Sequence, residues 1–399
     1  MTSQADDLRE RLAPASVDEA AAMVRERAES GATLTFAGGG TESALGYEPE
    51  RVDALLETTR LDRVVEYAPS DMVVSVEAGM TLAALQTTLA PQRQRLALDP
   101  ALPERATIGG LLATNAFGPL RTRYGTLRDL IVGITIVRAD GTLARGGGKV
   151  VKNVAGFDLP KLMVGSLGSL GLIVRATFRL HPMPERERWY EAGGLTAEGV
   201  RALCRSLIAR RLEPAAVFAR LEPGGSHYAL AVLFEGFETG VDAQGASWLE
   251  SANAAGAQIV DAGPEGVRIA AGAAHPRGPV RIRISVPPAA FVETHRDAVL
   301  PLGDCFEAEC VAYPTTGTFL LGGFVRDGAG SRAVATIAAA RAACEALGGS
   351  LVVADMDAAL RGSVDPYGTL PQSFPIMRRL KERFDPGRRF NRGRFLGRL

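Results

Sequence analysis

The chain has 399 residues, which is more than one hydrophobic core usually serves, so two domains are expected. Lysine plus arginine and aspartate plus glutamate both number 45, and this zero net charge argues against nucleic acid as the principal partner. Hydrophobic residues make up 46% of the chain, which is enough to build buried cores.

Neither the N-terminus nor any apolar stretch predicts a membrane segment. Residues 1–11 are acidic and polar, whereas a secretory signal has a basic start and an apolar block. The apolar stretch 163–174 is interrupted by glycine and serine and is too short to span a bilayer. We therefore expect a cytoplasmic protein that reaches the inner membrane only through partners.

The metal-binding residue types are too scattered to predict a metal site. The four cysteines form no C-x-x-C pair, and the four histidines show no H-x-H or H-x-x-H spacing. We interpret the cysteines as structural thiols and expect no iron–sulfur cluster in this chain. These residues are Cys204, Cys305, Cys310 and Cys344, and His181, His227, His275 and His295.

The first 182 residues predict small helices and strands that alternate. Residues 17–30 have helical periodicity with Ser16 as the N-cap, and strand 33–36 runs into three glycines. Strands 52–56 and 72–77, helices 82–89 and 108–115, a hairpin of 130–138 with 142–144, and strand 170–180 follow. Pro182 and Pro184 then interrupt the pattern, so we place a domain boundary after residue 182.

Residues 183–373 predict a second domain of different order. Strand 189–195, helix 196–211, strands 215–221 and 228–234, and helix 241–255 suit an antiparallel sheet with helices on one face. Helix 331–347 and strand 350–354 suggest a second half of the same kind. In the basic tail from residue 374, Arg378, Arg379, Lys381 and Arg383 are predicted on a solvated helix face.

Three glycine-rich loops suggest a bound dinucleotide. Residues 37–43 (AGGGTES) follow a strand, where glycines let backbone N–H groups approach a pyrophosphate, although a plain tight bend has the same pattern. Ser43 replaces the third glycine of the NAD-binding fingerprint, and Val150 after Lys149 excludes a P-loop. Further glycines cluster at 107–110 and 165–173. Three such loops favour a long dinucleotide over a compact phosphate.

Several motifs then resemble a known family. Pro103, residues 106–110 (ATIGG), Asn115, Gly118, residues 123–125 (RYG), Asp129 and Asp140-Gly141 occur in the order of the vanillyl-alcohol-oxidase-like, PCMH-type FAD-binding family. Residues 152–159 (KNVAGFDL), the glycine-rich 163–173 and the closing 390–394 (FNRGR) look like the FAD-binding E subunits of bacterial glycolate oxidases.

The resemblance implies an α+β fold with defined domains and site residues. It implies a two-subdomain PCMH-type FAD-binding domain over residues 1–182, an antiparallel-sheet α+β cap over 183–373, and a tail, 374–399, that returns to the flavin domain. Thr41 stands where covalent relatives place histidine, so FAD is expected to be non-covalent. The implied cofactor-binding residues, acting mostly through backbone donors, are Gly38, Gly39, Gly40, Thr41, Ser43, Pro103, Thr107, Ile108, Gly109, Gly110, Gly118, Tyr124, Gly125, Gly168, Gly171 and Ile173.

For function, the resemblance implies an FAD-dependent oxidoreductase acting on CH–OH donors. It would be the FAD-binding subunit of a complex that oxidises glycolate or another small 2-hydroxy acid, beside a catalytic flavoprotein subunit and an iron–sulfur subunit. A self-sufficient dehydrogenase, using a carboxylate-binding arginine and a base among Arg281, Arg283 and His275, is one alternative. A non-catalytic structural subunit is another, and no catalytic residue is assigned.

Overall fold

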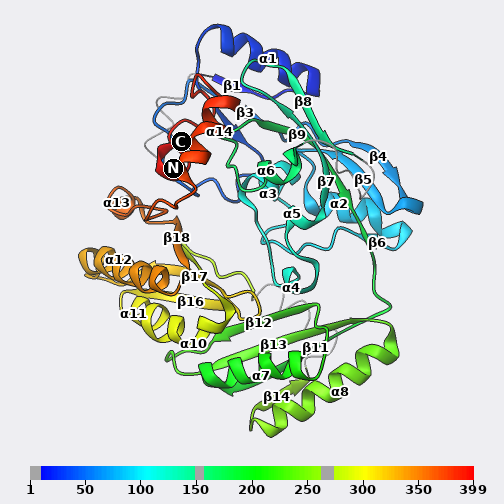
Figure 1. Ribbon diagram of the computed structural model, residues 1–399, viewed down its shortest axis with the longest axis vertical. Helices are drawn as coiled ribbons and strands as arrows, with labels where there is room; N and C mark the ends of the chain where they lie inside the picture. The colour runs from blue at the N-terminus through cyan, green and yellow to red at the C-terminus, as the bar shows by residue number, and fades with distance from the viewer. Residues whose placement is uncertain (1–9, 149–156, 262–273) are drawn as a thin grey trace. The chain divides into compact units, whose positions relative to one another are not determined.

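A computed structural model describes residues 10–148, 157–261 and 274–399, so residues 152–156 of the motif quoted above lie outside the described chain. The chain divides into two compact units (Figure 1). Unit 1 comprises Met1–Phe117, Gly125–Met183 and Thr369–Leu399, and unit 2 comprises Gly118–Tyr124 and Pro184–Gly368. Both mix helices with sheets, and the α+β class is confirmed.

Sheets of two kinds form the described part of unit 1. Strands β1 (Glu10–Leu12) and β2 (Leu34–Ala37) each pair in parallel with β3 (Ala54–Glu57). A five-stranded antiparallel sheet has the order β4-β5-β9-β7-β8. Its strands are β4 (Val64–Ala68), β5 (Val73–Glu77), β7 (Ile131–Val137), β8 (Leu143–Gly147) and β9 (Leu172–Arg179). Pro182, which the sequence analysis takes as an interruption of the pattern, lies in a short strand, β10 (His181–Pro182), which pairs with β6 (Gln94–Arg95).

Local capping explains where the helices of unit 1 begin. Helix α1 (Val17–Glu29) starts as predicted after Ser16, whose hydroxyl accepts a hydrogen bond from the N–H of Glu19 at 3.1 Å.

The five-stranded sheet lies between two cores, because Val174 packs with α1 whereas Phe178 packs with helices α2 and α3. The other helices of this unit are α2 (Leu82–Leu89), α3 (Ile108–Thr114), α5 (Leu127–Leu130), α6 (Leu159–Met163) and α14 (Phe374–Phe384).

The tail of the chain is built into unit 1 through Lys381 on α14. The prediction of a solvated position is wrong for this residue, which is only 2% exposed. Its Nζ donates to the carboxylate of Asp385 at 2.7 Å and to the carbonyl oxygens of Ser169 and Phe390 at 2.8 and 3.0 Å. Burial lowers the pKa of Lys381, and the Asp385 carboxylate opposes that shift. Three acceptors thus replace the water that the ammonium loses.

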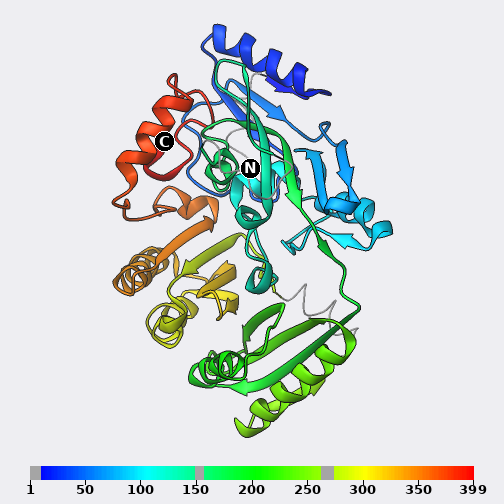
Figure 2. The ribbon, with the colours of Figure 1, turned by 45° about the vertical axis from the view of Figure 1, so that its right-hand side comes forward.

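Unit 2 contains an eight-stranded antiparallel sheet with the order β14-β11-β13-β12-β16-β17-β15-β18. Helices α7 (Ala197–Ala209) and α8 (Glu238–Ala254) lie on one face of it (Figure 2), as the sequence predicts. Its strands are β11 (Arg186–Leu195), β12 (Ala216–Leu221), β13 (Tyr228–Gly236), β14 (Gln258–Asp261), β15 (Val280–Ser285), β16 (Phe306–Tyr313), β17 (Thr318–Val325) and β18 (Ser350–Asp355). The remaining helices are α4 (Arg121–Tyr124), α10 (Phe291–Thr294), α11 (Leu300–Gly303), α12 (Gly330–Ala346) and α13 (Ala358–Arg361).

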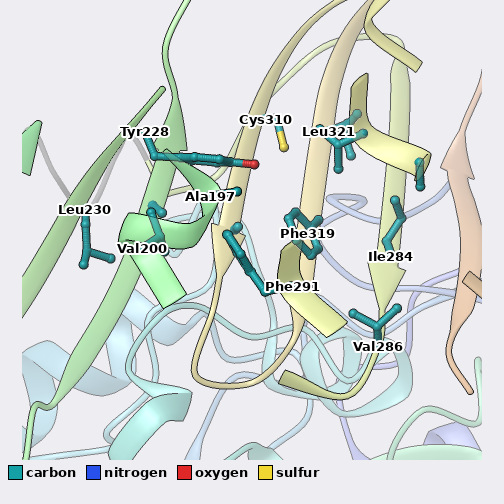
Figure 3. Packing of buried hydrophobic residues seen from close by; sticks show 14 of the residues in the cluster. Ala197, Val200, Tyr228, Leu230, Ile284, Val286, Phe291, Cys310, Phe319 and Leu321 are labelled. Atoms are coloured by element: carbon teal, nitrogen blue, oxygen red, sulfur yellow. The ribbon is translucent and has the colours of Figure 1, made fainter. Parts of the chain in front are cut away.

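Aliphatic and aromatic side chains together fill the core between this sheet and its helices (Figure 3). The rings of Phe291 and Phe319 stack with centroids 4.9 Å apart. Tyr228 is fully buried, and its hydroxyl lies 2.8 Å from Nδ1 of His295. Within the ranges that the structure describes, no helix is long and apolar enough to cross a bilayer.

We predict that replacing Lys381 with Met destabilises unit 1 by about 3–5 kcal/mol, because Asp385 would remain buried without its cation. Urea unfolding measures this change. Arg379→Met, an exposed substitution two positions earlier, is the control and should cost less than about 0.5 kcal/mol. Equal midpoints for the two variants would show that the tail is not anchored at Lys381.

A second prediction concerns the pH dependence of unit 2. Burial lowers the pKa of His295 in the folded state, so the unfolded chain binds this proton at a higher pH. The stability that neutral His295 contributes is therefore fully present above about pH 6.5. As the pH drops below this value, the free energy of unfolding decreases by at most about 1.4 kcal/mol per pH unit. Both tryptophans lie in unit 2, so unfolding at pH 7.5 and 5.5 can be followed by fluorescence. His295→Gln should flatten this slope, and an unchanged slope would contradict the assignment.

Candidate cofactor-binding site

The first part of the candidate site is the turn that follows β2. The backbone N–H groups of Gly38, Gly39, Gly40 and Thr41 donate to no acceptor in the part of the chain that the structure describes. Gly39 has to be glycine, because a Cβ there would lie 1.6 Å from the carbonyl oxygen of Arg105. A run of N–H donors of this kind can hold an anion such as a diphosphate. Ser43 closes the turn and accepts a hydrogen bond from the Arg394 guanidinium through its carbonyl oxygen.

The second part, Pro103 to Gly110, lies directly against this turn. A Cβ on Gly38 would be 2.1 Å from Oγ1 of Thr107, so the two loops touch. Thr107 caps α3 by accepting from the N–H of Gly110 at 3.3 Å. The N–H groups of Ile108 and Gly109 donate to the carbonyl oxygens of Met80 and Ala78 at 2.9 and 2.7 Å. The N–H groups of Ile108 and Gly109 are thus used within the protein. This loop can let its backbone lie close to a ligand, whereas the first turn can offer N–H donors to it.

The third part is the loop from Gly165 to Gly171. Leu167 has a left-handed backbone (φ 49°), a conformation that costs a branched residue about 1–2 kcal/mol. It is held by its N–H, which donates to the carbonyl oxygen of Ala113 at 2.8 Å, and by its carbonyl, which accepts from Nδ2 of Asn391. Gly168 follows with φ 67°, and a Cβ there would lie 2.5 Å from the same Asn391 Nδ2. The loop therefore depends on the end of the chain.

Asn391 is a site residue that sequence reasoning did not assign. Its Oδ1 accepts from the N–H of Phe36 on β2 at 3.2 Å, while its Nδ2 donates to Leu167. One side chain therefore connects the strand before the first glycine turn with the third loop. The only sequence signal was its place in the closing motif, residues 390–394.

The remaining predicted residues have other surroundings. Gly125 precedes α5, where Thr126 and Asp129 form a capping box. Gly171 leads into β9, and Ile173 on that strand is buried in a core of unit 1. Gly118 and Tyr124 belong to unit 2 and are therefore not grouped with the loops of unit 1. The structure brings together Gly38 to Ser43 and Pro103 to Gly110, and it ties Gly168 to them through Asn391.

Two buried oxygens near the third loop test whether a polar cofactor fits. Ser166 Oγ and Asn115 Oδ1 have no hydrogen-bond partner within residues 10–148, 157–261 and 274–399. Asn115 ends α3 beside this loop, since a Cβ on Gly165 would lie 3.7 Å from the Asn115 Cβ. An unsatisfied buried polar atom costs about 1–3 kcal/mol. Unpartnered N–H groups and oxygens in glycine-lined loops fit a large polar ligand such as FAD.

The cap residues considered for catalysis all have interactions within the protein. Nη2 of Arg281 lies 3.5 Å from Asp355, whose other oxygen is 2.6 Å from Arg361. His275 and Arg283 also have interactions within the protein. No group of three metal-binding side chains occurs in the part of the chain that the structure describes.

Part of the chain resembles known FAD-binding proteins. Residues 11–147 match the family described as the FAD binding domain. A D-2-hydroxyglutarate dehydrogenase of Xanthomonas citri pv. viticola is 34% identical over 171 residues, which are 43% of this chain and 36% of that protein. The glycolate oxidase subunit GlcE of Escherichia coli is 38% identical over 122 residues, which are 30% of this chain and 35% of that protein. The matches thus span little more than a third of these relatives' lengths.

A solved structure supports the fold of nearly the whole chain. Substrate-bound p-cresol methylhydroxylase superposes with a TM-score of 0.74 at 17% identity, covering 96% of this chain and 88% of that one. At this identity the similarity shows the fold alone. The PCMH-type FAD-binding fold and FAD as the cofactor are confirmed.

The unpartnered Ser166 hydroxyl leads to a prediction. Ser166→Ala should leave the stability of the FAD-free protein unchanged or raise it, because the lost hydroxyl has no protein partner. If that hydroxyl binds FAD, the same change should raise the Kd for FAD about tenfold. Thermal unfolding without FAD and fluorescence titration with FAD measure the two effects.

The matched control is Ser169→Ala. The Ser169 hydroxyl donates to the carbonyl oxygen of Ser166 at 2.7 Å, so its loss should lower stability by about 0.5–1.5 kcal/mol and leave the Kd unchanged. The reverse pattern in the two variants would remove Ser166 from the site.

Proposed function

Because residues 11–147 match the family described as the FAD binding domain, we propose that this chain is the FAD-binding subunit of a complex that oxidises glycolate or another small 2-hydroxy acid. The observation that carries the proposal is the run of unpartnered N–H groups at Gly38–Thr41, packed against the Thr107 loop within this domain. The relatives support the substrate class, since one is named for 2-hydroxyglutarate and the other for glycolate.

The roles of the cofactor and the chain can be separated. FAD supplies the hydride acceptor for C2 of the substrate, as flavins do in such oxidations. The chain would hold the diphosphate with the N–H groups of Gly38, Gly39, Gly40 and Thr41. Ser166 and Asn115 would bind other polar atoms of the cofactor. No histidine stands at Gly38–Ser43, which supports non-covalent binding.

The proposed subunit role rests on the interactions that the described side chains make. A self-sufficient enzyme needs a cation for the substrate carboxylate and a base for its hydroxyl proton. Arg281 already shares Asp355 with Arg361, and the described cysteines are free thiols distributed along unit 2 rather than a cluster. A catalytic flavoprotein subunit would then provide the acid–base groups, and an iron–sulfur subunit would take the electrons.

The test compares the chain alone with the chain among its partners. Purified chain loaded with FAD should release the flavin on denaturation, and its dye-linked oxidation of glycolate and D-lactate should be slow. Co-expression with a candidate catalytic flavoprotein and a candidate iron–sulfur protein should raise the rate about 10²–10⁴-fold, the usual contribution of positioned acid–base groups.

Three results would change this proposal. Fast, saturable turnover by the chain alone would identify a self-sufficient dehydrogenase. Flavin that stays with the denatured chain would show a covalent bond. A colourless chain that cannot be reconstituted with FAD would point to a structural subunit.

A further inference from the structure

The tail of the chain holds two carbonyl groups of the third loop, Gly165 to Gly171. Asn391 donates from Nδ2 to the carbonyl oxygen of Leu167, and Lys381 donates from Nζ to that of Ser169 at 2.8 Å. The donors lie 224 and 212 positions away from these carbonyl groups in the sequence, and all four residues belong to unit 1. The shape of the loop therefore depends on contacts with the tail.

Asn391 meets the chemical requirements of its position. It is 2% exposed and lies between the N–H of Phe36, which can only donate, and the carbonyl of Leu167, which can only accept. A side chain that satisfies both needs one acceptor and one donor, and the asparagine amide has them. Its backbone is left-handed (φ 43°), a conformation that asparagine adopts more readily than most residues.

The third loop packs directly on this amide. A Cβ on Gly168 would lie 2.5 Å from Asn391 Nδ2 and 3.0 Å from Cδ2 of Phe36, so the loop, the tail and β2 meet at one place. Ser166, two positions before Gly168, has a buried hydroxyl with no partner in the part of the chain that the structure describes. Asn391 thus holds the backbone beside a polar group that is available to a ligand.

We propose that Asn391 is a positioning residue for FAD binding, acting through the third loop. This inference rests on the proposed FAD site, of which the loop is a part. By holding the carbonyl of Leu167, the amide keeps the loop in the conformation that binds the cofactor. The apparent Kd rises when a smaller fraction of the protein has the binding conformation. The coupling is reciprocal, so bound FAD also stabilises the contact between the tail and the loop.

Hydrogen exchange tests the positioning without any cofactor. In the FAD-free full-length chain, Asn391→Asp keeps the acceptor for Phe36 but removes the donor for Leu167, so amide exchange over residues 165–171 should become about tenfold faster. Asn391→Gly tolerates the left-handed backbone and removes both contacts. It should have the same effect on the loop, and it tests the proposal if the buried carboxylate prevents folding.

Two matched controls remove other polar contacts of unit 1. Arg392→Met, at the next residue of the tail, removes the ion pair with Glu50 at 3.1 Å. Tyr67→Phe removes the hydrogen bond to Gln94 at 3.0 Å, which connects β4 with β6. Both variants should leave exchange over residues 165–171 unchanged, because neither contact involves the third loop.

FAD titration tests the functional part. Asn391→Asp and Asn391→Gly should each raise the Kd about tenfold, whereas both controls should stay within about twofold of wild type. Combining Asn391→Gly with Ser166→Ala should raise the Kd by less than the product of the two single effects, because both changes act through one loop. In wild-type protein, saturating FAD should slow amide exchange over residues 389–394.

Each contrary outcome has a distinct meaning. Unchanged exchange over residues 165–171 in both Asn391 variants would overturn the positioning role. Faster exchange with an unchanged Kd, or single effects that simply multiply in the double variant, would overturn the route to the cofactor through the loop. Tail exchange that does not respond to FAD would contradict the coupling. Wild-type protein that fails to bind FAD would overturn the proposed function itself, and with it this inference.

Discussion

The buried ion pair between Lys381 and Asp385 is the interaction on which the arrangement of unit 1 depends most. Lys381 joins helix α14 to the carbonyl oxygens of Ser169 and Phe390, and Asp385 accepts a hydrogen bond from the N–H of Phe390. A lysine this deep in a protein is tolerated only when its donors are satisfied, and here all three are. The pair thereby holds the end of the chain against a loop more than 200 residues earlier in the sequence.

The candidate site depends on this anchor because the tail continues along β2. The N–H of Leu34 donates to the carbonyl oxygen of Arg389 at 2.8 Å, and the N–H of Asn391 donates back to Leu34 at 2.9 Å. The rings of Phe36 and Phe390 meet edge to face with centroids 4.9 Å apart. Residues 389–391 thus run beside β2, the strand that leads into Gly38. The turn with the unpartnered N–H groups is supported by the last residues of the protein.

In unit 2, buried polar groups lie on both faces of the sheet. Its core encloses one histidine–tyrosine pair between the helices and the sheet, and its other face has Glu235 bound to the Gly118–Tyr124 segment. The Tyr228 hydroxyl and one carboxylate oxygen of Glu235 each have a partner on another element, as buried polar groups usually do.

Some features of this protein were determined by short stretches of sequence. Ser16 and Thr107 begin α1 and α3 as predicted because an N-cap acts on N–H groups two or three residues away. The hairpin at Asp140-Gly141 and the alternating strands of unit 2 followed from equally local rules. The glycine loops and the FAD-binding fold were likewise accessible from residue order and from family resemblance.

Only the tertiary structure shows which hydrogen-bond partners the buried polar groups find in distant parts of the sequence. Lys381 had the sequence context of a solvated helix face, and only its packing on Ser169 and Phe390 made it buried. The same holds for Asn391 with Leu167, 224 positions apart, and for Tyr124 with Glu235, 111 positions apart. Secondary structure follows from neighbours in the chain, whereas the burial of a charge depends on acceptors that folding brings from elsewhere. That difference is why the sequence predicted the glycine loops, and why only the fold revealed the side chains that hold them.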